Sequence, residues 1–121
     1  MDFQAVLKEM VDRVNGGVAA TIMANDGIPL QNYVKAGGTC DLESLGVEYG
    51  KVMVELKKAA EVLSLGGIEE LVITSGGLKV VIRIVSPEYF AVFALTPEGN
   101  VGKAKYYLKR AAQNVAKELA A

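Results

Sequence analysis

The most informative absences in this sequence are those of histidine and of paired cysteines. The 121 residues hold no histidine and a single cysteine, Cys40. Histidine is the commonest general base and, with cysteine, a usual zinc ligand, so triad chemistry and a His/Cys zinc site are not expected. A single cysteine cannot form an internal disulfide, which agrees with a reducing compartment. We therefore expect no metal, no cofactor and no enzymatic activity.

The sequence also lacks a hydrophobic segment of membrane length and an excess of either charge. Its longest uninterrupted apolar run is Tyr89 to Leu95, far shorter than the roughly 20 residues of a membrane helix. It has Asp2 where a signal peptide has its basic region. Lys and Arg number 13 and Asp and Glu 14, a net charge of -1, which gives no global field to attract nucleic acid. We expect a soluble, cytoplasmic protein with no nucleic-acid partner and no direct membrane insertion.

Apolar side chains are what the sequence has in quantity. They make up 51% of the residues, enough for one core, so residues 1–121 are expected to form a single domain. An apolar chain with little net charge is poorly protected against association. Part of its apolar surface is therefore expected to lie in an interface with a partner.

Apolar spacing and turn residues divide the chain into helices and strands in the order αββαβββα, an α+β pattern. Helices are expected over residues 2–15, 42–63 and 101–119, and strands over residues 18–24, 28–34, 71–74, 78–85 and 89–95. Asp26-Gly27 favours a hairpin turn because this pair adopts the positive φ angles of a type I′ turn. Pro29 lacks a backbone N–H, so the second strand is expected at a sheet edge. The last three strands are expected to form an antiparallel meander.

Three short patterns suggest chemistry but have simpler explanations. Cys40 precedes a helix, yet it has no basic neighbour to stabilise a thiolate, so a structural thiol is expected. Asp41 and Glu43 point in different directions on a helix and fit the capping and first-turn positions better than an acid/base pair. The segment from Gly99 to Ala104 is too short for a P-loop and lacks its magnesium-binding hydroxyl. None of these patterns predicts an active site.

The last helix carries a cluster of basic residues, for which two explanations remain open. Its members are Lys103, Lys105, Lys109, Arg110 and Lys117. They form either a solvated face that also complements the helix dipole or a docking surface.

The long central helix is the most informative element of the sequence. Its main apolar stripe is Leu42, Leu45, Tyr49, Val52, Met53, Leu56, Ala60 and Leu63. Away from that stripe, Gly46 and Gly50 lie beside Val47 and Val54, which extends the apolar surface toward the other face. Each glycine costs about 1 kcal/mol relative to alanine inside a helix. The second apolar surface is either a wide core face or a partner interface, and Val54 favours the interface.

The order and spacing of several short motifs resemble the roadblock/dynein light chain family and its bacterial MglB branch. These motifs are Gly17-Val18-Ala19-Ala20-Thr21-Ile22, Asp26-Gly27-Ile28-Pro29, Asp41-Leu42-Glu43, Gly67-Ile68-Glu69-Glu70-Leu71-Val72-Ile73 and Asn100-Val101-Gly102-Lys103. The resemblance implies a five-stranded antiparallel sheet in the order 2-1-5-4-3, with the long helix on one face and the terminal helices on the other. It also implies homodimers, and partners that are Ras-like GTPases or larger scaffolds.

The resemblance and the helix pattern together lead to predicted sites. The third strand is the sheet edge free of proline, so an identical strand is expected to pair with it. The predicted dimer interface is Gly46, Val47, Gly50, Val54, Leu71, Val72, Ile73 and Thr74. The predicted GTPase-docking residues are Glu48, Lys51, Glu55 and Lys58. Arg83 and Arg110 are expected to be solvated residues and not arginine fingers.

The leading functional hypothesis is a homodimeric, non-catalytic regulator of a small Ras-like GTPase. The MglB branch resembles GTPase-activating proteins, but this sequence ends at Ala121 without the C-terminal extension often seen in that branch. An activating and a localising role both stay open. The alternative is a dimeric scaffold, similar to motor-complex light chains, with no effect on a nucleotide cycle. A small-molecule sensor is disfavoured by the lack of convergent polar groups.

Overall fold

The computed structural model describes residues 1–120, and its elements follow the predicted order. Their bounds are α1 Phe3–Arg13, β1 Gly17–Ala24, β2 Pro29–Val34, α2 Leu42–Val62, β3 Glu70–Thr74, β4 Lys79–Ile84, β5 Tyr89–Leu95 and α3 Val101–Ala120. The predicted bounds differ from these by a residue or two. The α+β class inferred from the sequence is confirmed.

The five strands form one antiparallel sheet in the order β2-β1-β5-β4-β3, as the family resemblance implied. β5 lies at the centre, and all its residues from Phe90 to Leu95 are buried. A central strand that is covered on both faces needs apolar side chains on both, which explains why the longest apolar run in the sequence is β5. β2 and β3 form the two edges.

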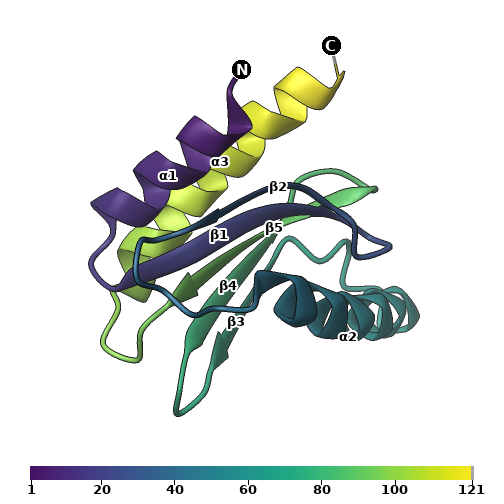
Figure 1. The fold of residues 1–121 in the computed structure, drawn as a ribbon. Helices are drawn as coiled ribbons and strands as arrows, with labels where there is room; N and C mark the ends of the chain where they lie inside the picture. Colours follow the sequence, from purple (N-terminus) through teal and green to yellow (C-terminus); the bar gives the residue numbers. More distant parts are fainter. Residues whose placement is uncertain (121) are drawn as a thin grey trace.

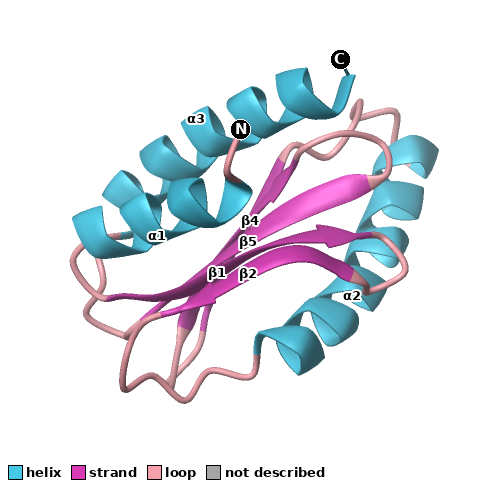
Figure 2. Cartoon of the chain, turned by 45° about the horizontal axis from the view of Figure 1, so that its top comes forward, coloured by secondary structure: helices cyan, strands magenta, loops and turns pink. Residues whose placement is uncertain are grey.

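Helices cover both faces of the sheet (Figure 1). α1 and α3 lie side by side on one face and α2 crosses the other, an arrangement that is also clear in Figure 2. Each face has its own apolar cluster. On the α1 and α3 side, the cluster includes Leu7, Val11, Val81, Phe93 and Leu108. On the α2 side, it consists of Met23, Met53, Val80, Ile82, Phe90 and Val92.

Each helix begins at a side chain that accepts a hydrogen bond from the first turn. Asp2 accepts from the Ala5 N–H at 3.2 Å, and Asn100 accepts from the Lys103 N–H at 3.0 Å. Asp41 accepts from both the N–H and the hydroxyl of Ser44, at 3.1 and 2.7 Å. These bonds satisfy donors that have no partner inside the helix. The predicted capping role of Asp41 is confirmed.

The two helices on the same face are joined to the sheet by turns that contact each other closely. The Thr96 N–H donates to the Gly16 carbonyl at 2.8 Å, and the Asn100 N–H donates to the Asn15 carbonyl at 3.1 Å. Gly16 has a φ of 85°, and a Cβ there would lie 2.5 Å from the Gly99 Cα. Only glycine fits at this position. The turns that end α1 and begin α3 are thereby fixed together.

Candidate protein-interaction surfaces

The β3 edge presents backbone groups that have no partner strand. Residue pairs of an antiparallel ladder alternate between hydrogen-bonded and non-hydrogen-bonded. The Ile84 N–H donates to the Glu69 carbonyl at 3.0 Å, and the Ser75 N–H donates to the Leu78 carbonyl at 3.1 Å. The odd-numbered residues of β3 therefore bond to β4, and the N–H and C=O groups of Glu70, Val72 and Thr74 point to the open edge. An unprotected edge of this kind is a template for another strand.

The first residue of this edge is held by two cations. The Glu70 carboxylate lies 3.1 Å from Arg83 Nη1 and 3.2 Å from Lys105 Nζ. Glu70 and Arg83 are mostly buried, so the expectation that Arg83 is solvated is wrong. The contact with Arg83 connects β3 to β4, and the contact with Lys105 connects β3 to α3. Together they fix the start of the edge strand.

Gly46 and Gly50 of α2 face the protein's own sheet. A Cβ at Gly46 would lie 2.3 Å from the Sδ and Cε atoms of Met23, and a Cβ at Gly50 would lie 3.6 Å from the Phe90 ring. Both glycines are buried. Of the two explanations for the second apolar surface, the core face accounts for Gly46 and Gly50.

Val47 and Val54 lie on a different flank of α2 from the one nearest β3. Together with Gly46, Gly50 and Lys51, they line a cavity of about 150 Å³ beside residues 25–27 of the β1–β2 turn. Leu45 instead lines a cavity of about 480 Å³ with Gly77 and Leu78 of the β3–β4 turn. Helical spacing puts Val52 on the same flank as Leu45. The prediction that Val47 and Val54 lie in a dimer interface stays a prediction, and Val52 is a second candidate because it lies on the flank nearest β3.

The four predicted docking residues share the outer ridge of α2. Lys51 Nζ lies 3.3 Å from Glu48, and Lys58 Nζ lies 3.6 Å from Glu55. All four side chains are well exposed. The ridge therefore presents alternating charges directly to solvent, in pairs that contribute little to folding stability.

The outer face of α3 is basic. Lys103, Lys109, Arg110 and Lys117 are exposed, and among residues 1–120 no acidic side chain forms an ion pair with them. Lys105, the fifth basic residue, is the one that contacts Glu70. The α3 face is thus positive, in contrast to the paired charges of α2.

Two groups that the sequence singles out, Cys40 and Asp41, have pKa values shifted by their surroundings at the start of α2. Burial raises the pKa of the Cys40 thiol, and the neighbouring Asp41 carboxylate raises it further. Bonds from Ser44 lower the pKa of Asp41. Residues 1–120 contain no cluster of metal-binding side chains. They also contain no helix with the length and apolar character that crossing a membrane requires.

Comparison with known proteins places this arrangement in a family. No protein-family model and no curated protein matches the chain. Among solved structures, MglC from Myxococcus xanthus is 37% identical, with 98% of this chain and 99% of that chain covered and a TM-score of 0.69. A roadblock/LC7 domain from Streptomyces avermitilis is 12% identical, with 100% of both chains covered and a TM-score of 0.86. The chain belongs to the roadblock/LC7 family.

Within that family, the sequence is nearer to MglC than to MglB. The MglB gliding protein from Thermus thermophilus is 19% identical, with 95% of this chain and 86% of that chain covered and a TM-score of 0.85. That likeness concerns the fold. This roadblock/LC7 chain thus shares its sheet and its three helices with MglB, and much more of its sequence with MglC.

Sequence reasoning missed an apolar cluster at the end of α2 in this roadblock/LC7 protein. Val62, Leu63 and Leu65 are 83%, 64% and 71% exposed, and we call them the α2 tip. The sequence pattern places Leu63, and Val52 at 43% exposure, in the core stripe of the helix. α2 extends past the apolar cluster around Phe90 before it ends, so the apolar residues of its last turn are not covered by the sheet. An apolar cluster before Gly66-Gly67, at a helix end, was the available indication.

Proposed function

We propose that this protein is a homodimeric regulator, without chemistry of its own, that binds a small Ras-like GTPase through the outer ridges of two α2 helices. The observation that carries the proposal is the open edge of β3, which lies on the same side of the molecule as uncovered apolar residues of α2. Both features favour pairing with a second copy.

The proposed dimer pairs β3 with β3 of a second copy around a two-fold axis at Val72. In this register Val72 lies opposite its own copy, and Glu70 lies opposite Thr74. These are the residues whose backbone groups point to the open edge, so the register uses all of them. The proposed edge interface is Leu71, Val72, Ile73 and Thr74, as the sequence predicted, together with Glu70.

The same register would cover the exposed apolar residues at the α2 tip and Val52, on the flank of α2 nearest β3. Strands that pair antiparallel run in opposite directions, so the segment before β3 of one protomer lies beside the β3–β4 turn of the other. The α2 tip would then cover the cavity at that turn, which Leu45 and Leu78 line. The Val52 flanks of the two helices would face each other. Burying these side chains stabilises association by about 25 cal/mol per Å² of apolar area.

The proposed GTPase-docking surface is the ridge of Glu48, Lys51, Glu55 and Lys58. These side chains point away from the sheet and are well exposed, and a two-fold dimer presents two such ridges next to each other. The resemblance to the roadblock family supplies the partner class. The alternating charges supply groups that a partner of complementary charge pattern recognises.

The test uses a Ras-like GTPase from the same organism, loaded with GDP or with a non-hydrolysable GTP analogue. Binding is measured by isothermal titration calorimetry against wild type, the double variant Lys51→Glu/Lys58→Glu and a matched α3 control, Lys103→Glu/Lys109→Glu. We expect the α2 variant to weaken binding about tenfold or more with the dimer intact, and the control to have no effect. Unaltered binding by the α2 variant would remove the docking assignment.

Turnover of the GTPase separates the regulatory roles. An activator must stabilise the phosphoryl-transfer transition state, so binding without faster hydrolysis identifies an effector or localiser. Arg83→Ala is expected to leave turnover unchanged, because Arg83 is committed to Glu70. Failure to bind either nucleotide state favours the dimeric scaffold, an alternative that the second charged surface on α3 supports.

A further inference from the structure

We propose that the outer face of α3, together with the cavity between α1 and α3, binds an acidic amphipathic helix of a partner protein. This site lies on the opposite face of the sheet from α2, and it does not rest on dimerisation or on GTPase binding.

The charges of this face follow one stripe. Lys103, Arg110 and Lys117 are spaced seven residues apart, and a straight helix drifts only about 20° per seven residues. The three side chains therefore align along the exposed side of α3. They form no ion pair with an acid among residues 1–120, whereas Lys8 and Arg13 on neighbouring α1 pair with Asp12 and Glu9. We call these three residues the basic stripe.

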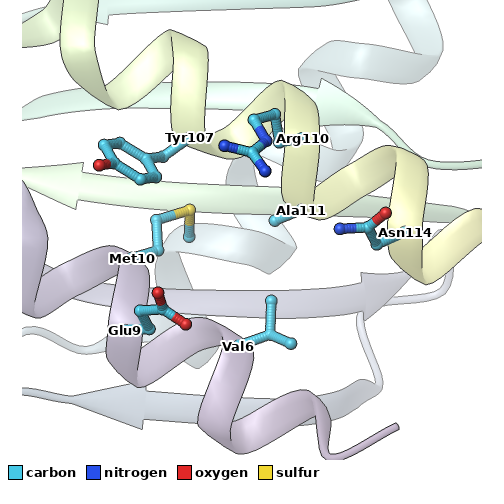
Figure 3. Close-up of a pocket in the computed structure, with 7 residues that line it drawn as sticks. All are labelled: Val6, Glu9, Met10, Tyr107, Arg110, Ala111 and Asn114. Carbon is cyan, nitrogen blue, oxygen red and sulfur yellow. The ribbon is translucent and has the colours of Figure 1, made fainter.

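A cavity of about 150 Å³ opens beside Arg110, the middle residue of the basic stripe (Figure 3). Val6 and Met10 of α1 and Ala111 of α3 supply its apolar lining, and Glu9, Tyr107, Arg110 and Asn114 supply polar groups at its border. The volume suits one aliphatic side chain. A ligand that inserts such a side chain here places its own backbone over the stripe.

Arg110 has donors to spare at this position. It donates one hydrogen bond to the Tyr106 hydroxyl at 3.3 Å and lies 5.6 Å from the centre of that ring. A guanidinium has five N–H donors and binds a carboxylate through two of them. Stacking on Tyr106 holds the guanidinium in place, which reduces the entropy lost on binding. Exposed arginine and tyrosine are also the residue types that contribute most to binding energy in protein interfaces.

The spacing of the stripe identifies the partner as a helix. Seven helical residues rise about 10.5 Å, so acids spaced seven apart on a second helix match the three cations in turn. An anionic membrane fits less well, because the apolar side of α3 is buried in the core and cannot enter lipid. Nucleic acid fits less well because the chain has a net charge of -1 and so no broad positive field to attract a polyanion. Glu9 and Glu118 border the stripe, and Arg13 and the N-terminal ammonium respectively pair with them.

The experiment uses fluorescently labelled synthetic helical peptides and the full-length protein. The test peptide carries three glutamates spaced seven apart and one leucine on the same face. A second peptide has the same composition with the glutamates distributed around the helix, and a third has alanine in place of the leucine. We expect saturable binding of the test peptide in fluorescence anisotropy, and affinities at least about tenfold lower for the other two.

Protein variants then locate the peptide. Arg110→Glu/Lys117→Glu is expected to reduce affinity for the test peptide about tenfold or more, while Lys51→Glu/Lys58→Glu on α2 leaves it unchanged. Circular dichroism checks that both variants fold. Equal binding of all three peptides, equal losses in both variants or no saturable binding would overturn the proposal. Binding of phosphatidylserine vesicles or duplex DNA in preference to the test peptide would also overturn it, in favour of a membrane or nucleic-acid surface.

Discussion

Two glycines of α2 show how the low helix propensity of glycine is weighed against the space that the core leaves for a side chain. Gly46 and Gly50 both sit inside the helix, but a Cβ at Gly46 would collide with Met23, whereas one at Gly50 would make an ordinary contact with Phe90. Alanine is favoured over glycine by about 1 kcal/mol inside a helix. We therefore expect Gly50→Ala to raise the free energy of unfolding by up to about 1 kcal/mol.

Gly46→Ala is the matched control. Its added methyl group must displace the buried end of Met23, and overpacking a core costs about 1 to 3 kcal/mol. Urea unfolding followed by circular dichroism measures both variants. We expect no gain in stability for Gly46→Ala, and a gain equal to that of Gly50→Ala would show that the packing against Met23 does not restrict position 46.

The reactivity of the Cys40 thiol is set by its burial and by the neighbouring Asp41 carboxylate. Its raised pKa means that a smaller fraction of the thiol is ionised near neutral pH, and the thiolate is the form that reacts. We expect alkylation by iodoacetamide at pH 8 to be slower in the folded protein than in the urea-unfolded chain, with the pH profile of the rate shifted to higher pH.

Asp41→Asn tests the second cause of that shift. Removing the carboxylate charge is expected to move the rate profile of Cys40 part of the way back to lower pH, because burial, the larger cause, remains. A thiol that reacts faster folded than unfolded at neutral pH would point instead to an activated cysteine.

At the scale of elements, the two flanks of α2 lead to opposite expectations for two similar substitutions. Val52 and Val54 are 43% and 44% exposed, but only Val52 lies on the flank near β3. A charge buried without a partner in an interface costs several kcal/mol, and symmetry places it there twice. We expect Val52→Glu to shift the protein from dimer to monomer in sedimentation velocity, and Val54→Glu to leave the dimer intact.

The pattern of outcomes identifies the interface. Lys58→Glu, on the solvent ridge, serves as the neutral control and should sediment like wild type. If Val54→Glu dissociates the dimer and Val52→Glu does not, the helix flank first predicted from the sequence is the correct one.

Elements were predictable from the sequence where local rules determine them. The capping bond of Asp41 and the strand β5 both follow from residue type and spacing alone. The flanks of α2 were not predictable, because Gly46 and Val54 lie on adjacent parts of the helix surface and only the packed sheet shows which of them it covers. The contact of Arg83 with Glu70 was missed for the same reason, since it depends on the register between β3 and β4. The strand order came from family resemblance and not from the pattern.

For the molecule as a whole, the open backbone groups of Glu70, Val72 and Thr74 on β3 give a direct test of how two copies assemble. If two copies pair around Val72, the two Val72 Cα atoms lie about 5.5 Å apart, within the range that a disulfide spans. We expect Val72→Cys in a Cys40→Ser background to form a disulfide-linked dimer under mild oxidation, detected by non-reducing gel electrophoresis.

The adjacent position provides the control for register. Ile73→Cys should crosslink poorly, because in that register residue 73 lies opposite residue 71 and not its own copy. Efficient crosslinking at 73 with none at 72 would indicate a different two-fold axis, and wild-type protein that stays monomeric at micromolar concentration would contradict the dimer itself.

The ion pairs along the outer ridge of α2 have a consequence for kinetics. Glu48 with Lys51 and Glu55 with Lys58 cancel each other's charge, so a partner approaching this ridge meets little long-range field. Its association rate should therefore change little with ionic strength. An acidic partner approaching Lys103, Arg110 and Lys117 meets uncancelled charge, and its association should slow steeply as the Debye length falls from about 30 Å at 0.01 M salt to about 8 Å at 0.15 M. Stopped-flow measurements across this range of salt would then assign each partner to one face of the molecule.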